Sequence, residues 1–218
     1  QRTLDAELDA ATRRRVNPFD WKIAFPAVFA RGGFDAVIGN PPCIRVQTMT
    51  EWAPLEVELY KKHYKSASKG NYDIYVCFVE RGLGLLNPAG RLGFILPHKF
   101  FNSQYGEPLR AIVSGGRHLA EVIHFGDQQV FDNATTYTCL LILGKAAALE
   151  FQFVKAADLD KWQREGIAVR GTIQSDRVTK SEWNFKVGAG TALFERLEAI
   201  QTRLGDVVDL FVGLQTSC

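Results

Sequence analysis

The chain has 218 residues, of which 46% are hydrophobic and 11% aromatic. This length and composition suffice for one packed core and predict one to two domains. Charged residues make up 23% of the chain, which excludes a disordered tail, and the formal net charge of +2 is too small to indicate nucleic-acid binding by itself. No stretch approaches the roughly 18 to 20 apolar residues of a membrane span, and the N-terminus lacks the layout of a signal peptide. We therefore predict a globular protein with no membrane partner.

The cysteines and histidines give no sign of a metal site. The cysteines stand at 43, 77, 139 and 218 without a Cys-x-x-Cys pair, and the histidines at 63, 98, 118 and 124 are scattered. Cys77 and Cys139 lie in apolar runs and are predicted to be core thiols. We expect a cytoplasmic protein without a bound metal, in which the histidines have structural roles.

The predicted elements alternate between helices and strands. Residues 4–15 form a charged helix that Asn17-Pro18 would end. Phe34 to Ile38 is a short apolar run stopped by Gly39, which indicates a buried strand. Further helices are predicted over 52–65, 72–86 and 103–114, and further strands over 91–96, 119–125, 136–143 and 151–154.

This alternation predicts an α/β fold with a mainly parallel sheet and helices on both faces. The loop between the strands at 119–125 and 136–143 is too short for a helix, so these strands are predicted to form an antiparallel pair at one edge of the sheet. From about 157 the chain becomes more polar, and a helix is predicted near 191–203.

The residues that follow the first predicted strand are Asn40-Pro41-Pro42-Cys43, and in open α/β sheets ligands bind beyond the carboxyl ends of strands. Two prolines in succession cannot continue a strand, because proline fixes φ and lacks an N–H. Pro41 also pushes Asn40 towards an extended conformation. The predicted result is a stiff elbow, in which the Asn40 side-chain oxygen and the Pro41 carbonyl face the same space.

Two such acceptors suit an exocyclic amine on an aromatic ring, whose lone pair is delocalised into the ring. Acceptors aimed at its N–H bonds would favour a tetrahedral nitrogen and localise the lone pair, as preorganised electrostatic stabilisation. The same residues would also suit an ordinary strand-to-loop turn, so both interpretations of the elbow stay open at this point.

Three segments together resemble one family of enzymes. Residues 34–42 and the following Ile44-Arg45-Val46-Gln47 resemble the catalytic motif of S-adenosyl-L-methionine-dependent amino-methyltransferases, most of all the adenine-N6 branch, in which Asn-Pro-Pro-Tyr or Phe follows a hydrophobic strand. The segments 70–78 and 85–97 together resemble the next helix–strand unit, and 129–143 is similar to a later loop-and-strand motif. The pattern looks like the type IIG restriction–modification polypeptides and their relatives in phage defence.

The resemblance implies a Rossmann-like methyltransferase domain, which transfers a methyl group from S-adenosyl-L-methionine to N6 of an adenine flipped out of double-stranded DNA. It implies that Asn40 and Pro41 hold the amino group and that Phe131 packs against the base. Pro42 and Phe78 would border the adenine of the cofactor. Cys43 occupies the catalytic position where the family has an aromatic residue.

Two departures from the family pattern affect what the chain can do. The Cys43 thiol cannot stack on a base, an interaction worth roughly 1 to 3 kcal/mol. No Gly-rich loop for the methionine part of the cofactor precedes Asn40, so the cofactor site is expected to be incomplete in this chain. A nucleophilic role for Cys43 is disfavoured, because no histidine lies near it in the sequence.

Several alternatives remain open. The chain could be a degenerate methyltransferase fold retained as a DNA-binding module, which the cysteine favours, or a methyltransferase acting on RNA or protein glutamine. A basic patch after the elbow could neutralise DNA phosphates or be a solvated helix face; it consists of Lys61, Lys62, Lys65 and Lys69.

We interpret the chain as a fragment whose partner is the rest of its parent polypeptide. Residues 1–33 are predicted as an N-terminal helical and loop remnant and 34–156 as the catalytic half of the methyltransferase domain. Residues 157–203 are predicted as a helical connector and 204–218 as the start of a truncated target-recognition domain.

Overall fold

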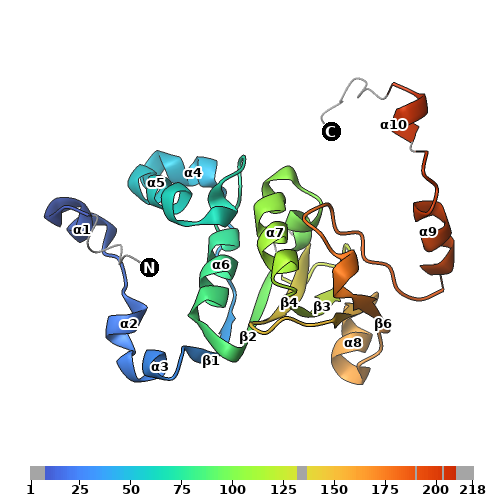
Figure 1. Cartoon of the computed structure of the whole chain (residues 1–218), viewed down its shortest axis with the longest axis horizontal. Helices are drawn as coiled ribbons and strands as arrows, with labels where there is room; N and C mark the ends of the chain where they lie inside the picture. The colour runs from blue at the N-terminus through green and yellow to red at the C-terminus, as the bar shows by residue number, and fades with distance from the viewer. Residues whose placement is uncertain (1–7, 132–136, 190, 203, 210–218) are drawn as a thin grey trace.

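The computed structural model describes residues 8–131, 137–189, 191–202 and 204–209, and it shows one twisted sheet flanked by helices (Figure 1). The strands are β1 (Phe34–Gly39), β2 (Leu86–Pro97), β3 (Leu119–His124), β4 (Thr138–Gly144), β5 (Glu150–Lys155) and β6 (Val169–Gln174). The α-helices are α1 (Ala10–Val16), α2 (Trp21–Ala24), α3 (Pro26–Ala30), α4 (Val46–Trp52), α5 (Pro54–His63), α6 (Tyr75–Leu85), α7 (Glu107–Gly115), α8 (Leu159–Glu165), α9 (Thr191–Glu198) and α10 (Leu204–Val207). The short 3-10 helices are η2 (Lys65–Ala67), η3 (His98–Phe101), η4 (Gln104–Gly106) and η5 (Ser175–Arg177).

The strands form a single sheet in the order β1-β2-β4-β3-β5-β6. β1 pairs in parallel with β2, and β3 in parallel with β5. β4 is antiparallel to both β2 and β3, and β6 is antiparallel to β5. β1, β2, β3 and β5 therefore all run in one direction, which confirms the predicted α/β fold with a mainly parallel sheet.

The antiparallel pair of β3 and β4 is present, but its predicted place at an edge of the sheet was wrong. β4 lies between β2 and β3, inside the sheet. Its residues Cys139, Leu141 and Leu143 are completely buried, as expected for a nearly continuous apolar strand with neighbours on both sides. The edge beyond β5 is formed by β6, whose residues are exposed or half-buried.

Two predicted elements have different bounds in the structure. The helix predicted over 52–65 is divided between α4 and α5, because Pro54 stands at the start of a new helix. β2 begins at Leu86 rather than at 91, and the shift in register between Phe34 and Ala36 of β1 shows that residues 87–90 form a bulge within β2.

The stretch 157–203 is not purely helical, because it also supplies β6 and part of the core. The segment after β6 returns over the sheet and buries Trp183, which is 4% exposed. The Trp183 ring lies 5.7 Å from that of Phe100 and 5.3 Å from that of Phe101, measured between centroids. The backbone N–H of Trp183 donates to the Phe101 carbonyl at 3.0 Å. The sequence did not predict that Trp183 belongs to the core, because most residues around it in the chain are polar.

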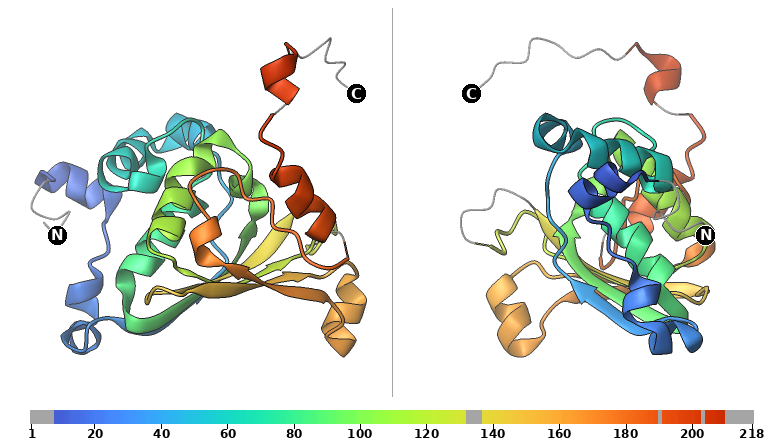
Figure 2. Two further views of the ribbon diagram at one scale, coloured as in Figure 1. Left: turned by 45° about the vertical axis from the view of Figure 1, so that its right-hand side comes forward. Right: turned by 90° about the vertical axis from the view of Figure 1, so that its left-hand side faces the viewer.

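Helices lie on both faces of the sheet, as predicted. Figure 2 shows α6 and α7 above the sheet and α8 beneath it. Leu92 of β2 and Leu141 of β4 are completely buried within the main core cluster. On the α8 side, the rings of Phe125 and Trp162 are 5.2 Å apart. None of the helices in the described ranges is both long and apolar enough to cross a membrane.

The carboxyl ends of the parallel strands lie together at one end of the sheet, which is where ligands bind in open α/β sheets. The strands β1, β2, β3 and β5 all end there, because they share one direction. Asn40 and His98 directly follow β1 and β2, while His124 and Lys155 are the last residues of β3 and β5. β4 runs the other way, so its first residue, Thr138, lies at the same end.

Arg110 on α7 joins three separate parts of the core. This side chain is 3% exposed. Its Nη1 donates to the carbonyl oxygens of Phe100 at 2.6 Å and Ser103 at 2.8 Å, and its Nε donates to that of Lys180 at 2.9 Å. The guanidinium thus connects α7 to the loop after β2 and to the segment that returns over the sheet.

We expect Arg110→Ala, made in the full-length parent polypeptide, to lower the free energy of unfolding by about 3 kcal/mol. The substitution leaves three carbonyl oxygens without their charged donor. Urea unfolding followed by tryptophan fluorescence should show a lower midpoint. Arg164→Ala on exposed α8 is the matched control and should leave the midpoint unchanged. Equal midpoints for the two variants would show that these hydrogen bonds do not stabilise the core.

Candidate active site

The elbow predicted after the first strand is present. Asn40, Pro41 and Pro42 leave the sheet at the carboxyl end of β1, where Pro41 is buried and the other two are exposed. The Asn40 side chain makes no hydrogen bond to any residue in the described ranges. Its amide is therefore available to a ligand.

The chain that leaves the elbow is fixed by a short antiparallel bridge. The Ile74 N–H donates to the Ile44 carbonyl, and the Val46 N–H donates to the Tyr72 carbonyl, both at 2.9 Å. Tyr72 is completely buried. Pairing with β2 fixes the other side of the elbow, so its backbone is held in place before any ligand arrives.

The elbow lines a cavity of about 270 Å³, which we call the elbow cavity. Phe131, predicted as the residue that packs against the base, lines the same cavity and is 40% exposed. The structure thus brings together the catalytic residues and the substrate-binding residue predicted from the sequence. The complete lining is Asn40, Pro41, Pro42, Cys43, Ile95, Leu96, Pro97, Phe131 and Thr138.

Thr138 is a residue of this cavity that sequence reasoning missed. It is 4% exposed, and its hydroxyl has no hydrogen-bond partner within the part of the chain that the structure describes. A buried hydroxyl without a partner costs about 1 to 3 kcal/mol, and a ligand that pairs with it recovers that energy. Nothing in the amino-acid sequence indicated that Thr138 lines this cavity. Only the direction of β4 in the folded sheet places this residue beside the elbow.

Cys43 contacts one of the two proposed acceptors directly. Its Sγ lies 3.8 Å from the Pro41 carbonyl oxygen, as a weak S–H donor. Burial raises the pKa of the Cys43 thiol, and the nearby Asp73 carboxylate raises it further. The thiol is therefore protonated at neutral pH, which argues against a nucleophilic role. The other two described cysteines, Cys77 and Cys139, are 3% and 0% exposed, which confirms them as core thiols.

Phe78, predicted to border the cofactor, does not line the elbow cavity. It lies on α6 and is 41% exposed, whereas Val76 and Val79 on the same helix are completely buried. A large exposed ring beside buried neighbours is available to a ligand or to another part of the protein.

The basic patch predicted after the elbow is used partly within the fold. Lys69 forms an ion pair with Glu107 of α7. Three tyrosines, Tyr60, Tyr64 and Tyr72, stand among or beside the lysines of this patch in the sequence, and Tyr72 is completely buried in the core. Tyr60 and Tyr64 are half-buried and pack against each other at a centroid separation of 6.0 Å. One of the four lysines of the patch, Lys69, is thus paired within the fold.

We expect Cys43 to react slowly with iodoacetamide at neutral pH, because its raised pKa keeps the reactive thiolate scarce. The rate should increase as the pH rises above the usual cysteine pKa, and Asp73→Asn should increase it at neutral pH by removing a negative charge. Peptide mass spectrometry of the full-length protein measures the modification at Cys43 alone. Modification at neutral pH as rapid as that of a small free thiol would contradict the protonated state.

Comparison with known proteins identifies the family. Residues 1–131, more than half of the 218-residue chain, match the Eco57I restriction-modification methylase family. The type II restriction enzyme and methyltransferase RM.Eco57I of Escherichia coli is 34% identical over 207 residues, covering 93% of this chain and 20% of that protein. The type II methyltransferase M.PaeR7I of Pseudomonas aeruginosa is 35% identical over 115 residues, covering 52% of this chain and 19% of that protein. The chain thus spans about a fifth of the length of these relatives.

A solved structure supports the fold. The crystal structure described as a modification subunit of a type I restriction enzyme from Vibrio vulnificus YJ016 matches with a TM-score of 0.51 at 9% identity, over 74% of this chain and 40% of that one. At this identity the likeness concerns the fold alone. With the family match over residues 1–131, the conclusion is that the chain belongs to the Eco57I restriction-modification methylase family.

Proposed function

We propose that this chain carries the catalytic elbow of a DNA adenine-N6 methyltransferase, which takes its methyl group from S-adenosyl-L-methionine and works in restriction–modification or phage defence. One observation supports this most strongly. Four residues that line the elbow cavity carry the relevant groups: the amide of Asn40, the carbonyl of Pro41, the ring of Phe131 and the hydroxyl of Thr138, which has no partner in the described ranges. These groups match the different parts of an aminopurine.

The two acceptors of the elbow would act on the amino group. The Asn40 side-chain oxygen and the Pro41 carbonyl would each accept one N–H of the adenine N6, which favours a tetrahedral nitrogen with a localised lone pair. Both oxygens are neutral, and they stabilise the positive charge that develops on the nitrogen during transfer. Neither is a strong base, so the proton released afterwards would pass to water.

The rest of the elbow cavity would hold the ring. Phe131 would pack against the face of the base, and the Thr138 hydroxyl would pair with a ring nitrogen, because buried polar atoms are stable only when hydrogen-bonded. A cavity of about 270 Å³ is near the small end of ligand pockets and suits one base flipped out of a duplex.

The cofactor would meet only part of its site in this chain. Pro42 and Phe78 are both exposed, and they would border its adenine ring. When bound, S-adenosyl-L-methionine supplies an electrophilic methyl group. No glycine-rich loop that could cradle its methionine part precedes β1 in residues 8–33. We therefore expect the remainder of the parent protein to complete the cofactor site, and this chain by itself to bind the cofactor weakly.

Radiolabelled methyl transfer to adenine-containing DNA tests the proposal, with the full-length protein and its Asn40→Ala variant. We expect the loss of the amide oxygen to lower the rate by about 100-fold or more, as for other preorganised polar groups. Asn40→Asp keeps an acceptor oxygen and should retain part of the activity.

Gln163→Ala removes an exposed amide from α8 and serves as the control that should keep full activity. Transfer by the wild type that survives Asn40→Ala would contradict the role of the elbow. Labelling of RNA or protein in place of DNA would reject the substrate.

A second candidate function is a methyltransferase fold that binds DNA without catalysis. The observation that favours it is Cys43, which has no aromatic ring and directs its thiol at the Pro41 carbonyl at 3.8 Å. The absence of methyl transfer by the wild-type protein, together with intact DNA binding, would support this candidate.

The role of position 43 can be measured by substitution in the full-length protein. We expect Cys43→Tyr to raise the efficiency of methyl transfer by roughly tenfold, because stacking on a base is worth about 1 to 3 kcal/mol. Cys43→Ala frees the Pro41 carbonyl without adding a ring, so it separates the two effects. An unchanged rate for Cys43→Tyr, in a protein that Asn40→Ala inactivates, would reject this account.

A further inference from the structure

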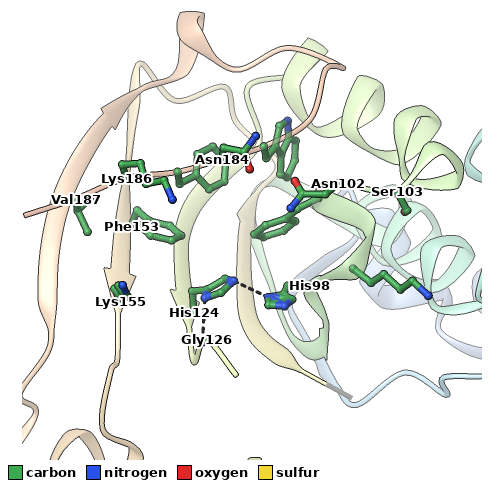
Figure 3. Close-up of a pocket in the computed structure, with 14 residues that line it drawn as sticks. His98, Asn102, Ser103, His124, Gly126, Phe153, Lys155, Asn184, Lys186 and Val187 are labelled. Carbon is green, nitrogen blue, oxygen red and sulfur yellow. Dashed lines mark hydrogen bonds between the residues drawn. The ribbon is translucent and has the colours of Figure 1, made fainter. Parts of the chain in front are cut away.

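Figure 3 shows the lining of a second cavity, whose volume is about 640 Å³. Like the elbow cavity, it lies at the carboxyl ends of the parallel strands. We call it the lysine cavity. Its walls come from the ends of β2, β3 and β5 and from the segment after β6 that returns over the sheet. The basic residues of its lining are His98, Lys99, His124, Lys155 and Lys186.

The lysine cavity carries positive charge without compensation. Its lining contains no Asp or Glu. Lys99, Lys155 and Lys186 form no ion pair with a carboxylate in the described ranges. Lys186 lies over the Phe194 ring, at 5.5 Å from its centroid, which leaves the charge of the ammonium in place. A hollow lined by ammonium groups of one sign attracts an anion.

Two histidines that the sequence showed as scattered meet in this cavity. The Gly126 N–H donates to His124 Nδ1 at 3.0 Å, so the proton of the neutral His124 ring is on Nε2. That Nε2–H donates to His98 Nδ1, and the neutral His98 ring therefore carries its own proton on Nε2. Burial and the adjacent His124 lower the pKa of His98 to about 4. At neutral pH the pair thus offers an N–H donor, and the charge comes from the lysines.

The remaining wall of the lysine cavity is aromatic. The rings of Phe101 and Trp183 are 5.3 Å apart between centroids, and so are those of Phe153 and Phe185. Phe101, Phe153 and Trp183 are at least 95% buried within the core, which gives this wall a fixed shape. Ammonium groups around an aromatic wall match a ligand that combines a phosphate with a flat ring, as a nucleotide does.

The lysine cavity adjoins the elbow cavity through β2 and β4. Pro97 lines the elbow cavity, and His98, the next residue, lines the lysine cavity. The His98 N–H donates to the Tyr137 carbonyl at 3.2 Å, directly before Thr138 of the elbow cavity. Residues adjacent along the backbone of β2 and of β4 therefore link the linings of the two cavities.

We propose that the lysine cavity binds a nucleotide of DNA next to the target adenine, with its phosphate at Lys155 and Lys186 and its base or sugar against the aromatic wall. This inference rests on the proposed function, since it takes the elbow cavity as the place of the target base. It assigns the neighbouring nucleotide to residues that come together only in the folded chain.

The salt dependence of DNA binding tests the proposal in the full-length protein. Each phosphate contact contributes about 0.9 to the slope of log Kd against log salt concentration. The Lys155→Ala/Lys186→Ala double variant should reduce this slope by about one, and each single variant by part of that amount, because the two lysines share one phosphate. Lys155→Arg keeps the charge and should retain the slope. Lys161→Ala on α8 removes an exposed lysine outside the cavity and is the matched control.

The same assay separates this inference from the proposed function. Asn40→Ala should lower the rate of methyl transfer by about 100-fold or more and leave the slope unchanged, because Asn40 is proposed to contact the base and not a phosphate. A loss of catalysis can thus be distinguished from a loss of phosphate binding in the lysine cavity. Slopes equal to the wild type for both Lys155→Ala and Lys186→Ala would overturn the proposal. It would also be overturned if dAMP, and not duplex DNA, bound in a way that depends on these two lysines.

A chemical substitution in the DNA gives an independent measurement. Once the methylated adenine is located, one phosphate beside it can be replaced by a neutral methylphosphonate. We expect one such position to weaken binding of the wild type several-fold and to have little further effect on Lys155→Ala, because both changes remove the same contact. Additive losses at every flanking phosphate would contradict this placement.

Discussion

The two cavities both depend on the direction of the strands. β1, β2, β3 and β5 end at one edge of the sheet, and β4, which runs the other way between β2 and β3, begins there. β4 is hydrogen-bonded on both sides and buried, so its position is strongly determined. It places Thr138 opposite the elbow, in the same cavity as Phe131 from the loop before it. An edge position for β4 would have separated these residues from Asn40.

The elbow is held in place by contacts of the chain both before and after it. Pro41 and Pro42 restrict the backbone, β1 is held by β2, and the chain beyond the elbow pairs with the segment before α6. Groups that are fixed before a ligand binds need little reorganisation during a reaction. Cys43 modifies this arrangement, because its thiol lies 3.8 Å from the Pro41 carbonyl oxygen as a weak donor.

The charges of the two cavities differ in a way that suits the proposed chemistry. The elbow cavity is lined by neutral residues only, whereas the lysine cavity next to it contains three lysines. An amine that accepts a methyl group becomes more positive, so an ammonium group in direct contact would oppose the transfer. Neutral oxygens at the reacting nitrogen, with the lysines in a separate cavity, would allow the DNA backbone to be bound without that repulsion.

The sequence by itself determined the local features: the strand β1, the elbow at Asn40 to Pro42, and the core thiols Cys77 and Cys139. Such features follow from the conformational restriction of proline and from apolar periodicity, which act over a few residues. The predicted burial of β1 was wrong, because β1 is an edge strand whose residues are exposed or half-buried, with Ile38 86% exposed. The family resemblance added Phe131. Only the tertiary structure decided that β4 lies inside the sheet, that Thr138 faces the elbow, and that His98, His124, Lys155 and Lys186 share a cavity. Strand order sets these long-range contacts, and it depends on the packing of the whole sheet.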